Sequence, residues 1–189
     1  GVTDVAEGDH VIACVSSWCG ICKYCTGGRP YLCLTSFAPR DPALGPRLSK
    51  GDEPINQFAN LSSFAGKILC TERSLVKIRD DMPLDRAALI GCGVTTGLGA
   101  ALNTVNIPAG ASVVIVGLGG VGLAALQGAR IVGAGKIIAI DTQSWKFSLA
   151  QKLGATHCVD ASDVDPVAAV QELTGGGADF VIECIGLVP

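Results

Sequence analysis

The sequence has few aromatic residues and no run of charge of one sign. Aromatic side chains make up 5% of the 189 residues and charged ones 16%, and the formal net charge is −3 at pH 7. A surface that binds nucleic acid or an anionic membrane needs clustered lysine and arginine. We therefore expect neither nucleic acid nor a membrane as a partner. Hydrophobic residues make up 49% of the chain, which predicts a globular protein with a well-buried core.

The sequence also lacks the marks of secretion and membrane insertion. Its start, Gly1 to Asp4, includes no basic segment followed by an apolar one. No apolar run reaches the roughly 20 residues that span a bilayer. We expect a cytoplasmic protein. In that reducing compartment nine cysteines predict metal ligands and buried small side chains rather than disulfides.

The two halves of the chain differ in texture. In the first, apolar runs at 10–15 and 67–70 predict strands, and residues 37–54 predict a surface loop because they are rich in proline, glycine and charge. After residue 108, segments of strand and helix type alternate, which predicts an α/β fold with a parallel sheet and right-handed crossovers. The expected strands are 112–116, 136–141, 156–159 and 179–184, and the expected helices are 121–132, one capped by Ser144 and one opened by Asp165 and Pro166.

Four closely spaced cysteines carry the strongest chemical signal, in the pattern Cys-x2-Cys-x2-Cys-x7-Cys. They are Cys19, Cys22, Cys25 and Cys33. Three thiolates at this spacing wrap one side of a small ion and the fourth closes a tetrahedron, so the pattern predicts a structural zinc with no open position. The alternative is a set of buried or disulfide-bonded cysteines. The metal should stabilise its lobe by on the order of 10 kcal/mol and take no part in catalysis.

A glycine-rich turn, Gly117-Leu118-Gly119-Gly120-Val121-Gly122, follows the first expected strand of the second half and opens a helix. This context favours a dinucleotide site over a plain turn between strand and helix. Gly117 permits the tight turn, Gly119 lets the backbone approach a pyrophosphate, and Gly122 allows close packing of helix and strand. The free N–H groups and the dipole of the helix N-terminus favour the phosphates.

Asp141 ends the second expected strand, about twenty residues after the glycines. There its carboxylate can accept hydrogen bonds from the ribose hydroxyls of NAD and repel a 2′-phosphate, which predicts NAD over NADP. The alternative is an ordinary solvated aspartate at a strand end. Cys92, taken alone, is more often a buried small side chain than a ligand.

In order and spacing, these motifs resemble the zinc-containing alcohol dehydrogenases of the medium-chain type. The resemblance rests on the four-cysteine loop, on Gly91-Cys92-Gly93-Val94-Thr95-Thr96-Gly97, on the glycine turn and on Ile140-Asp141. It extends to Gly8–Ile12, Ser63–Ala65 and Gly177–Gly186, and so covers essentially the whole chain. It implies that residues 1–94 are the C-terminal part of a β-rich GroES-like catalytic domain. Residues 95–189 would form a truncated Rossmann domain with a doubly wound parallel sheet.

The resemblance also implies roles for single residues. Cys92 matches one of three ligands of a catalytic zinc, which alcohol dehydrogenases hold with two cysteines and a histidine; the other two ligands belong to segments that precede Gly1. Thr96 would approach the nicotinamide and Lys146 the adenosine ribose, while Gly120 and Val121 would complete the pyrophosphate turn. His10 and His157 are expected as ordinary strand residues, and the core should include Cys14, Cys70, Cys158 and Cys184.

The activity implied is hydride transfer between a zinc-bound primary alcohol or aldehyde and NAD. The full-length enzyme would be a homo-oligomer, a dimer or tetramer. The 189 residues alone should hold zinc at the four cysteines, bind NAD weakly at most and oxidise no alcohol, because the catalytic zinc site and the sheet would be incomplete.

There are several alternative functions, and a feature of the sequence argues against each. An S-(hydroxymethyl)glutathione dehydrogenase would carry an arginine where this chain has Phe37, and Val15 suggests room for a bulky alcohol. A polyol or threonine-type zinc dehydrogenase often has a glutamate at the position of Cys92. A zinc-free quinone or enoyl reductase lacks the cysteine cluster. A zinc module for nucleic acid would surround the cysteines with basic and aromatic residues, which are few here.

Overall fold

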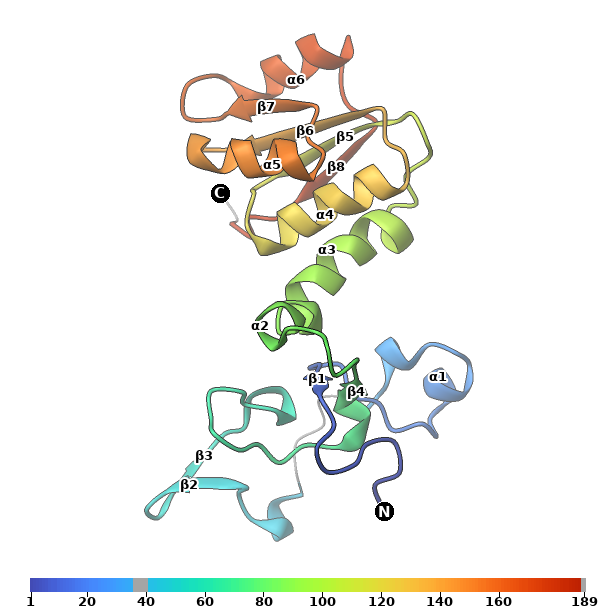
Figure 1. Ribbon diagram of the computed structural model, residues 1–189, viewed down its shortest axis with the longest axis vertical. Helices are drawn as coiled ribbons and strands as arrows, with labels where there is room; N and C mark the ends of the chain where they lie inside the picture. The colour runs from blue at the N-terminus through green and yellow to red at the C-terminus, as the bar shows by residue number, and fades with distance from the viewer. Residues whose placement is uncertain (36–40, 188–189) are drawn as a thin grey trace. The chain divides into compact units, whose positions relative to one another are not determined.

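The computed structural model describes residues 1–35 and 41–187 (Figure 1). It divides into two compact units, Gly1–Gly91 and Cys92–Pro189. The domain boundary predicted between residues 94 and 95 falls a few residues after this division. Phe37 lies outside the described residues.

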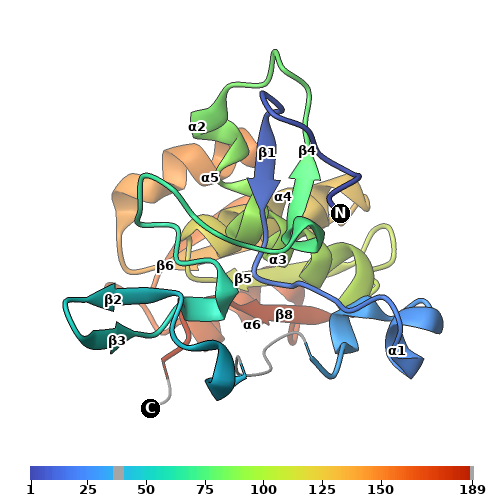
Figure 2. The ribbon, with the colours of Figure 1, turned by 90° about the horizontal axis from the view of Figure 1, so that it is seen from below.

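Unit 1 is held together by two small antiparallel pairs of strands (Figure 2). Strand β1 (Val11–Ala13) pairs with β4 (Leu75–Lys77), and β2 (Leu48–Lys50) pairs with β3 (Glu53–Ile55). The described residues of this unit also form short helical turns: α1 (Lys23–Thr26), η1 (Pro30–Leu32), η2 (Pro42–Leu44), η3 (Phe58–Asn60), η4 (Glu72–Ser74) and α2 (Leu84–Ala87).

One strand predicted in this unit is wrong. Residues 67–70 are not a strand, and the partner of β1 is β4, which lies several residues later. The carbonyl of Leu69 instead accepts a hydrogen bond from the side-chain amide of Gln57, at 3.0 Å. Since a side chain satisfies this backbone group, no neighbouring strand is needed there.

A long helical stretch, Leu84–Thr104, was not predicted. It runs through α2, the π-helical turn η5 (Ile90–Val94), α3 (Thr95–Gly99) and a second π-helical turn η6 (Ala100–Thr104). By length and composition alone its 21 residues could cross a membrane, whereas no stretch of that length was expected. Core helices of soluble proteins also meet this criterion, but they are mostly buried, whereas 17% of this window is buried. Within unit 2, α3 packs against a neighbouring helix.

Unit 2 contains a four-stranded parallel sheet in the order β7-β6-β5-β8. The strands are β5 (Ser112–Val116), β6 (Lys136–Asp141), β7 (His157–Asp160) and β8 (Phe180–Glu183). All three neighbouring pairs are parallel. The chain leaves β5 toward β6 on one side and returns to β8 on the other, so the order of strands reverses beside β5, as in doubly wound sheets. The predicted α/β fold class is confirmed.

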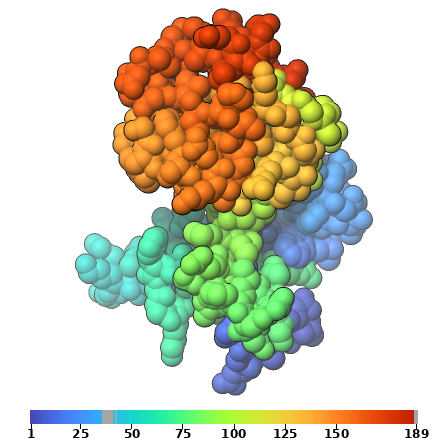
Figure 3. Space-filling model, turned by 45° about the horizontal axis from the view of Figure 1, so that its top comes forward, coloured from blue at the N-terminus to red at the C-terminus, as the bar shows by residue number. Residues whose placement is uncertain are grey.

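Helices cover both faces of this sheet, α4 (Gly120–Ile131) and α5 (Phe147–Leu153) on one and α6 (Pro166–Thr174) on the other (Figure 1). Alternate residues of the strands supply the two cores. Val113 and Ile115 belong to the cluster that includes α4, while Val114 belongs to the cluster that includes residues of α6. In the space-filling view, the orange and red segments that include α5 and α6 form a large part of this unit's surface (Figure 3).

The two predicted helix caps have different outcomes. The Asp165 carboxylate accepts from the N–H of Val167 at 3.0 Å, and Pro166 begins α6, as predicted. Ser144 is not a cap, because it lies inside the 3-10 turn η7 (Ser144–Lys146), which precedes α5 and follows Gln143. No side chain caps that turn, so the prediction for Ser144 is wrong.

Candidate functional site

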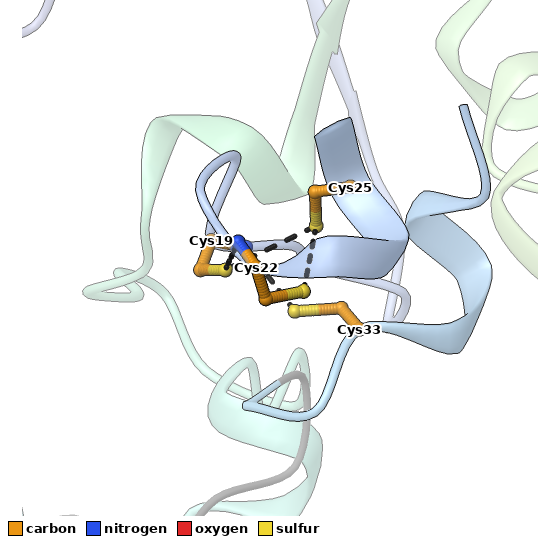
Figure 4. A group of neighbouring side chains, drawn as sticks. All are labelled: Cys19, Cys22, Cys25 and Cys33. Atoms are coloured by element: carbon orange, nitrogen blue, oxygen red, sulfur yellow. Dashed lines mark hydrogen bonds between the residues drawn. The ribbon is translucent and has the colours of Figure 1, made fainter. Parts of the chain in front are cut away.

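The four predicted zinc ligands converge in unit 1 (Figure 4). Their four Sγ atoms all lie within 4.8 Å of one another, with Cys22 and Cys25 at 3.5 Å and Cys19 and Cys25 at 3.9 Å. Four sulfurs about 2.3 Å from a tetrahedral zinc would lie about 3.8 Å apart. The cysteine side chains therefore fit a zinc ion.

Local structure explains why these sulfurs meet. Cys22 and Cys25 lie at the start and inside of the single-turn helix α1, and Cys33 ends the turn η1. Backbone N–H groups point at two of the sulfurs: Cys22 donates to Cys19 Sγ and Cys19 donates to Cys33 Sγ, each at 3.3 Å. N–H groups directed at sulfur stabilise thiolates, which are the form that binds metal.

The cysteine pKa values differ within the cluster. Hydrogen bonds from Thr35 lower the pKa of Cys33 to about 6, and a backbone hydrogen bond at Cys25 lowers that of Cys22 to about 7. Burial raises the pKa of Cys25 to about 11. The metal-free cluster thus mixes thiols and thiolates near neutral pH, whereas a dication would favour the thiolate at every position.

One support of this loop was not predicted from the sequence. The Arg73 guanidinium donates to the carbonyl of Cys19. Gly20, next along the loop, has φ +79°, and a Cβ atom there would lie 2.5 Å from Arg73 Nη1. A basic side chain from the segment before β4 therefore anchors the first ligand's backbone, and Gly20 leaves room for it.

The glycine turn of unit 2 has four glycines: packing requires Gly117 and Gly122, whereas Gly119 and Gly120 have open space. Gly117 has φ +92°, and a Cβ at Gly122 would lie 1.8 Å from the carbonyl oxygen of Gly117. Gly119 has φ −81°, and a Cβ there would meet nothing within 4 Å. Packing therefore explains Gly117 and Gly122, whereas the open space at Gly119 suits a ligand that approaches the backbone.

A cavity of about 780 Å³ opens beside this turn. Its lining includes Gly117, Leu118, Gly119, Asp141 and Lys146, so the predicted turn and the predicted ribose residues meet at the carboxyl ends of β5 and β6. Helix α4 begins at Gly120 with no side-chain cap, which leaves N–H groups of its first turn for a ligand. Gly120 and Val121 belong to this first turn but do not line the cavity.

Asp141 is nearly saturated with hydrogen bonds. Its Oδ2 accepts from the N–H of Leu118 at 2.7 Å and from Lys146 Nζ at 2.8 Å. Its Oδ1 accepts from the N–H of Gln143 and from Lys146 Nζ, both at 3.0 Å. Burial alone would raise the pKa of Asp141, but these hydrogen bonds outweigh it and hold that pKa below its usual range. The carboxylate is thus ionised, with Lys146 as its counter-ion.

Two predicted residues lie apart from this cavity. Cys92, in η5, has an exposed side chain, and Thr96, in α3, is also exposed. Neither lines the cavity. Within residues 1–35 and 41–187, the four-cysteine cluster is the only group of side chains that could hold a metal. The roles of Cys92 and Thr96 therefore stay predictions.

The remaining histidines and cysteines lie at ordinary positions. His157 is in β7 as predicted, whereas His10 immediately precedes β1. The cysteines expected in the core, Cys14, Cys70, Cys158 and Cys184, are all partly buried. Cys158 and Cys184 pack against the core beside α4, and burial raises the pKa of both thiols.

The packing of α3 on α4 was also not predicted. A Cβ at Gly97 would lie 2.2 Å from the carbonyl oxygen of Val121, and one at Gly128 would lie 2.7 Å from Ala101 Cβ. Glycines thus let the two helices approach closely. The many small residues from Gly91 to Ala101 could have indicated this close packing. The glycines among them, however, have low helix propensity, so the sequence did not predict a helix there.

Comparison with known proteins agrees with this geometry. Residues 120–189 match the family model described as zinc-binding dehydrogenase. The whole chain is 43% identical to an S-(hydroxymethyl)glutathione dehydrogenase of Synechocystis sp. and 42% identical to one of Photobacterium damsela subsp. piscicida. It covers 53% of each, so the chain spans about half the length of these relatives.

Solved structures give the same picture. A protein from Burkholderia ambifaria described as an alcohol dehydrogenase zinc-binding domain protein superposes with a TM-score of 0.86 at 38% identity. Benzyl alcohol dehydrogenase from Acinetobacter calcoaceticus superposes with a TM-score of 0.84 at 36% identity. Each match covers 98% of this chain and 52% or 51% of the other. By sequence, fold and ligand geometry together, the chain is similar to zinc-dependent alcohol dehydrogenases over about half of their length.

Proposed function

We propose that the complete protein transfers a hydride between a primary alcohol or aldehyde and NAD and requires zinc. The environment of Gly119 is the observation that supports the proposed cofactor. Gly119 borders the cavity and precedes a helix that has no side-chain cap. A Cβ atom on Gly119 would meet nothing within 4 Å, so packing does not require a glycine there. A pyrophosphate there would accept hydrogen bonds from the free N–H groups at the start of α4. Cytoplasmic location and a homo-oligomeric state are expectations from the same family.

The residues of unit 2 bind and orient the cofactor. Gly117 and Gly122 bring the turn close to α4, Gly119 gives the backbone access to the phosphates, and Asp141 lies where it can accept from ribose hydroxyls. Thr96 is proposed to contact the nicotinamide end. The protein thereby supplies position and electrostatics, while the cofactor supplies the redox chemistry.

Zinc is proposed at two places with different roles. The four-cysteine cluster offers four sulfurs and no open position, so an ion there stabilises unit 1. Cys92 is proposed as one ligand of a second ion, whose other ligands lie outside these 189 residues. A catalytic zinc polarises the oxygen of an alcohol or aldehyde and so assists hydride transfer to or from the neighbouring carbon.

The substrate proposed is an uncharged primary alcohol such as benzyl alcohol. The likeness to a benzyl alcohol dehydrogenase at 36% identity supports it, as does the small side chain of Val15. The second candidate is S-(hydroxymethyl)glutathione, which the curated relatives at 43% and 42% identity favour. The position expected to separate the two, Phe37, is not among the residues that the structure describes.

A direct comparison of the two substrates tests the substrate proposal. The complete protein is assayed for NADH formation with benzyl alcohol and with S-(hydroxymethyl)glutathione, and kcat/KM is compared. We expect the higher value with benzyl alcohol. A much higher value with the glutathione adduct would assign the protein to the second candidate, and a Phe37→Arg variant tests whether that position decides between them.

A further inference from the structure

At the proposed ribose end of the cavity, four residues of one segment, 141–146, form a closed set of contacts. Lys146 Nζ lies 2.8 Å and 3.0 Å from the two oxygens of Asp141. The same Nζ lies 5.7 Å from the centroid of the Trp145 ring. The Trp145 indole N–H donates to Gln143 Oε1 at 3.3 Å, and the N–H of Gln143 donates to Asp141.

This arrangement limits what Lys146 can bind. An ammonium group has three donors and no acceptor, and in this structure Lys146 directs its Nζ at both oxygens of Asp141. The Trp145 ring lies within cation–π distance of the same group. Lys146 lines the cavity, whereas Trp145 does not. The indole therefore acts on the cavity through the two lining residues that it contacts, Lys146 and Gln143.

A 2′-phosphate on the cofactor would need a free cation at this place. The side chain of Lys146 is 22% exposed and that of Asp141 only 7%, so an incoming phosphate meets a carboxylate whose counter-ion is already engaged. Among the residues that line the cavity in the described part of the chain, Lys146 is the only lysine or arginine. Discrimination against a 2′-phosphate thus depends on how firmly Lys146 is kept on Asp141.

We propose that Trp145 is a positioning residue for cofactor selection, which keeps the Lys146 ammonium on Asp141 and so prevents it from receiving a 2′-phosphate. The hydrogen bond from its indole N–H to Gln143 fixes the ring. Its 73% exposure also fits such a role, because burial in the core does not account for a tryptophan there. The inference rests on the proposed cofactor site and adds a selectivity residue to it.

The test compares the affinities of ADP-ribose and 2′-phospho-ADP-ribose by calorimetry, because these ligands carry the ribose end without the nicotinamide. In Trp145→Leu the ring is lost, and we expect the preference for ADP-ribose to fall by about threefold, the size of one exposed cation–π contact. In Trp145→Phe a ring face remains, and the preference should stay near that of the unaltered protein.

The outcomes separate this inference from the proposed function. An unchanged preference in Trp145→Leu, with ADP-ribose still bound, overturns the role of Trp145 and leaves the cofactor site intact. If the affinities for both ligands fall by the same factor, Trp145 has a merely structural role, and the proposed role in selection is also overturned. If the unaltered complete protein binds neither ligand, the cofactor site itself is wrong, and the inference fails with it. Thermal unfolding of each variant shows whether the fold is retained.

Discussion

A Cβ atom on Gly122 would lie 1.8 Å from the carbonyl oxygen of Gly117, whereas a Cβ on Gly119, between them, would meet nothing within 4 Å. Substitution by alanine should therefore have different effects on stability at Gly122 and at Gly119. Gly122→Ala forces the helix away from β5, so we expect unit 2 to lose about 3 kcal/mol or more of stability. Thermal unfolding measures this loss.

Gly119→Ala should leave stability nearly unchanged and weaken binding of ADP-ribose by about tenfold or more, because a methyl group blocks hydrogen bonds between backbone and phosphate. Gly99→Ala is the matched control, since Gly99 has open space and lies in a helix away from the cavity. If Gly119→Ala bound ADP-ribose normally, the turn would not be the pyrophosphate site.

The predicted parts of unit 2 illustrate what a sequence can specify. The bounds of β5 and β6 agree with the predicted segments 112–116 and 136–141. Strands buried on both faces are continuous apolar runs, so their ends are marked by the first polar or glycine residue. The cysteine cluster could also be predicted from the sequence, because metal geometry restricts ligand spacing.

The misses have physical causes that lie outside local sequence. Four glycines from Gly91 to Gly99 argue against a helix by propensity, yet Gly97 is needed for the approach of α3 to α4. Strand β4 was missed because it has only three residues, of which Val76 and Lys77 are exposed. The contact of Lys146 with Asp141 joins residues five apart through a turn whose geometry the pattern does not specify.

Zinc content tests the four-cysteine cluster. We expect about one zinc per 189-residue chain by elemental analysis and no alcohol oxidation by that chain alone. Cys25→Ser should lose the zinc and destabilise unit 1, because a structural site needs all four ligands. Cys70→Ser is the control: it changes a partly buried cysteine outside the cluster and should keep the metal. Two zincs per chain would mean that the catalytic ligands are misplaced.

Acid should weaken the join between β5 and β8 through Asp179. Its Oδ2 accepts from the backbone N–H and the hydroxyl of Ser112, at 2.8 Å and 2.7 Å, and these bonds lower the pKa of Asp179. A lowered folded-state pKa gives stability that is present above the unfolded pKa of about 3.9 and is lost as pH falls through the folded value.

Asp179→Asn should therefore be less stable than the unaltered protein near neutral pH, and the difference should shrink below about pH 4. Denaturant unfolding across this pH range measures it. Asp163→Asn is a suitable control, because the Asp163 carboxylate makes one long contact, 3.5 Å to the hydroxyl of Ser162. A difference that is independent of pH would show that Asp179 acts by packing and not by charge.

Cofactor preference should depend on Asp141. Asp141 lines the cavity, and in the proposed cofactor site a 2′-phosphate beside its carboxylate would meet a like charge. In Asp141→Gly the repulsion is lost and Lys146 is released, so the preference for NAD over NADP should narrow by about fivefold or more. Asp160→Gly, at the paired position of β7 outside the cavity, should not change it. Equal catalytic efficiency with both cofactors in the unaltered complete protein would contradict this account.

Zinc-dependent hydride transfer is tested by NADH formation from benzyl alcohol by the complete protein, before and after removal of zinc. We expect turnover with NAD that disappears when a chelator removes the metal and returns when zinc is restored. Turnover that persists in protein shown by elemental analysis to be free of metal would contradict this expectation.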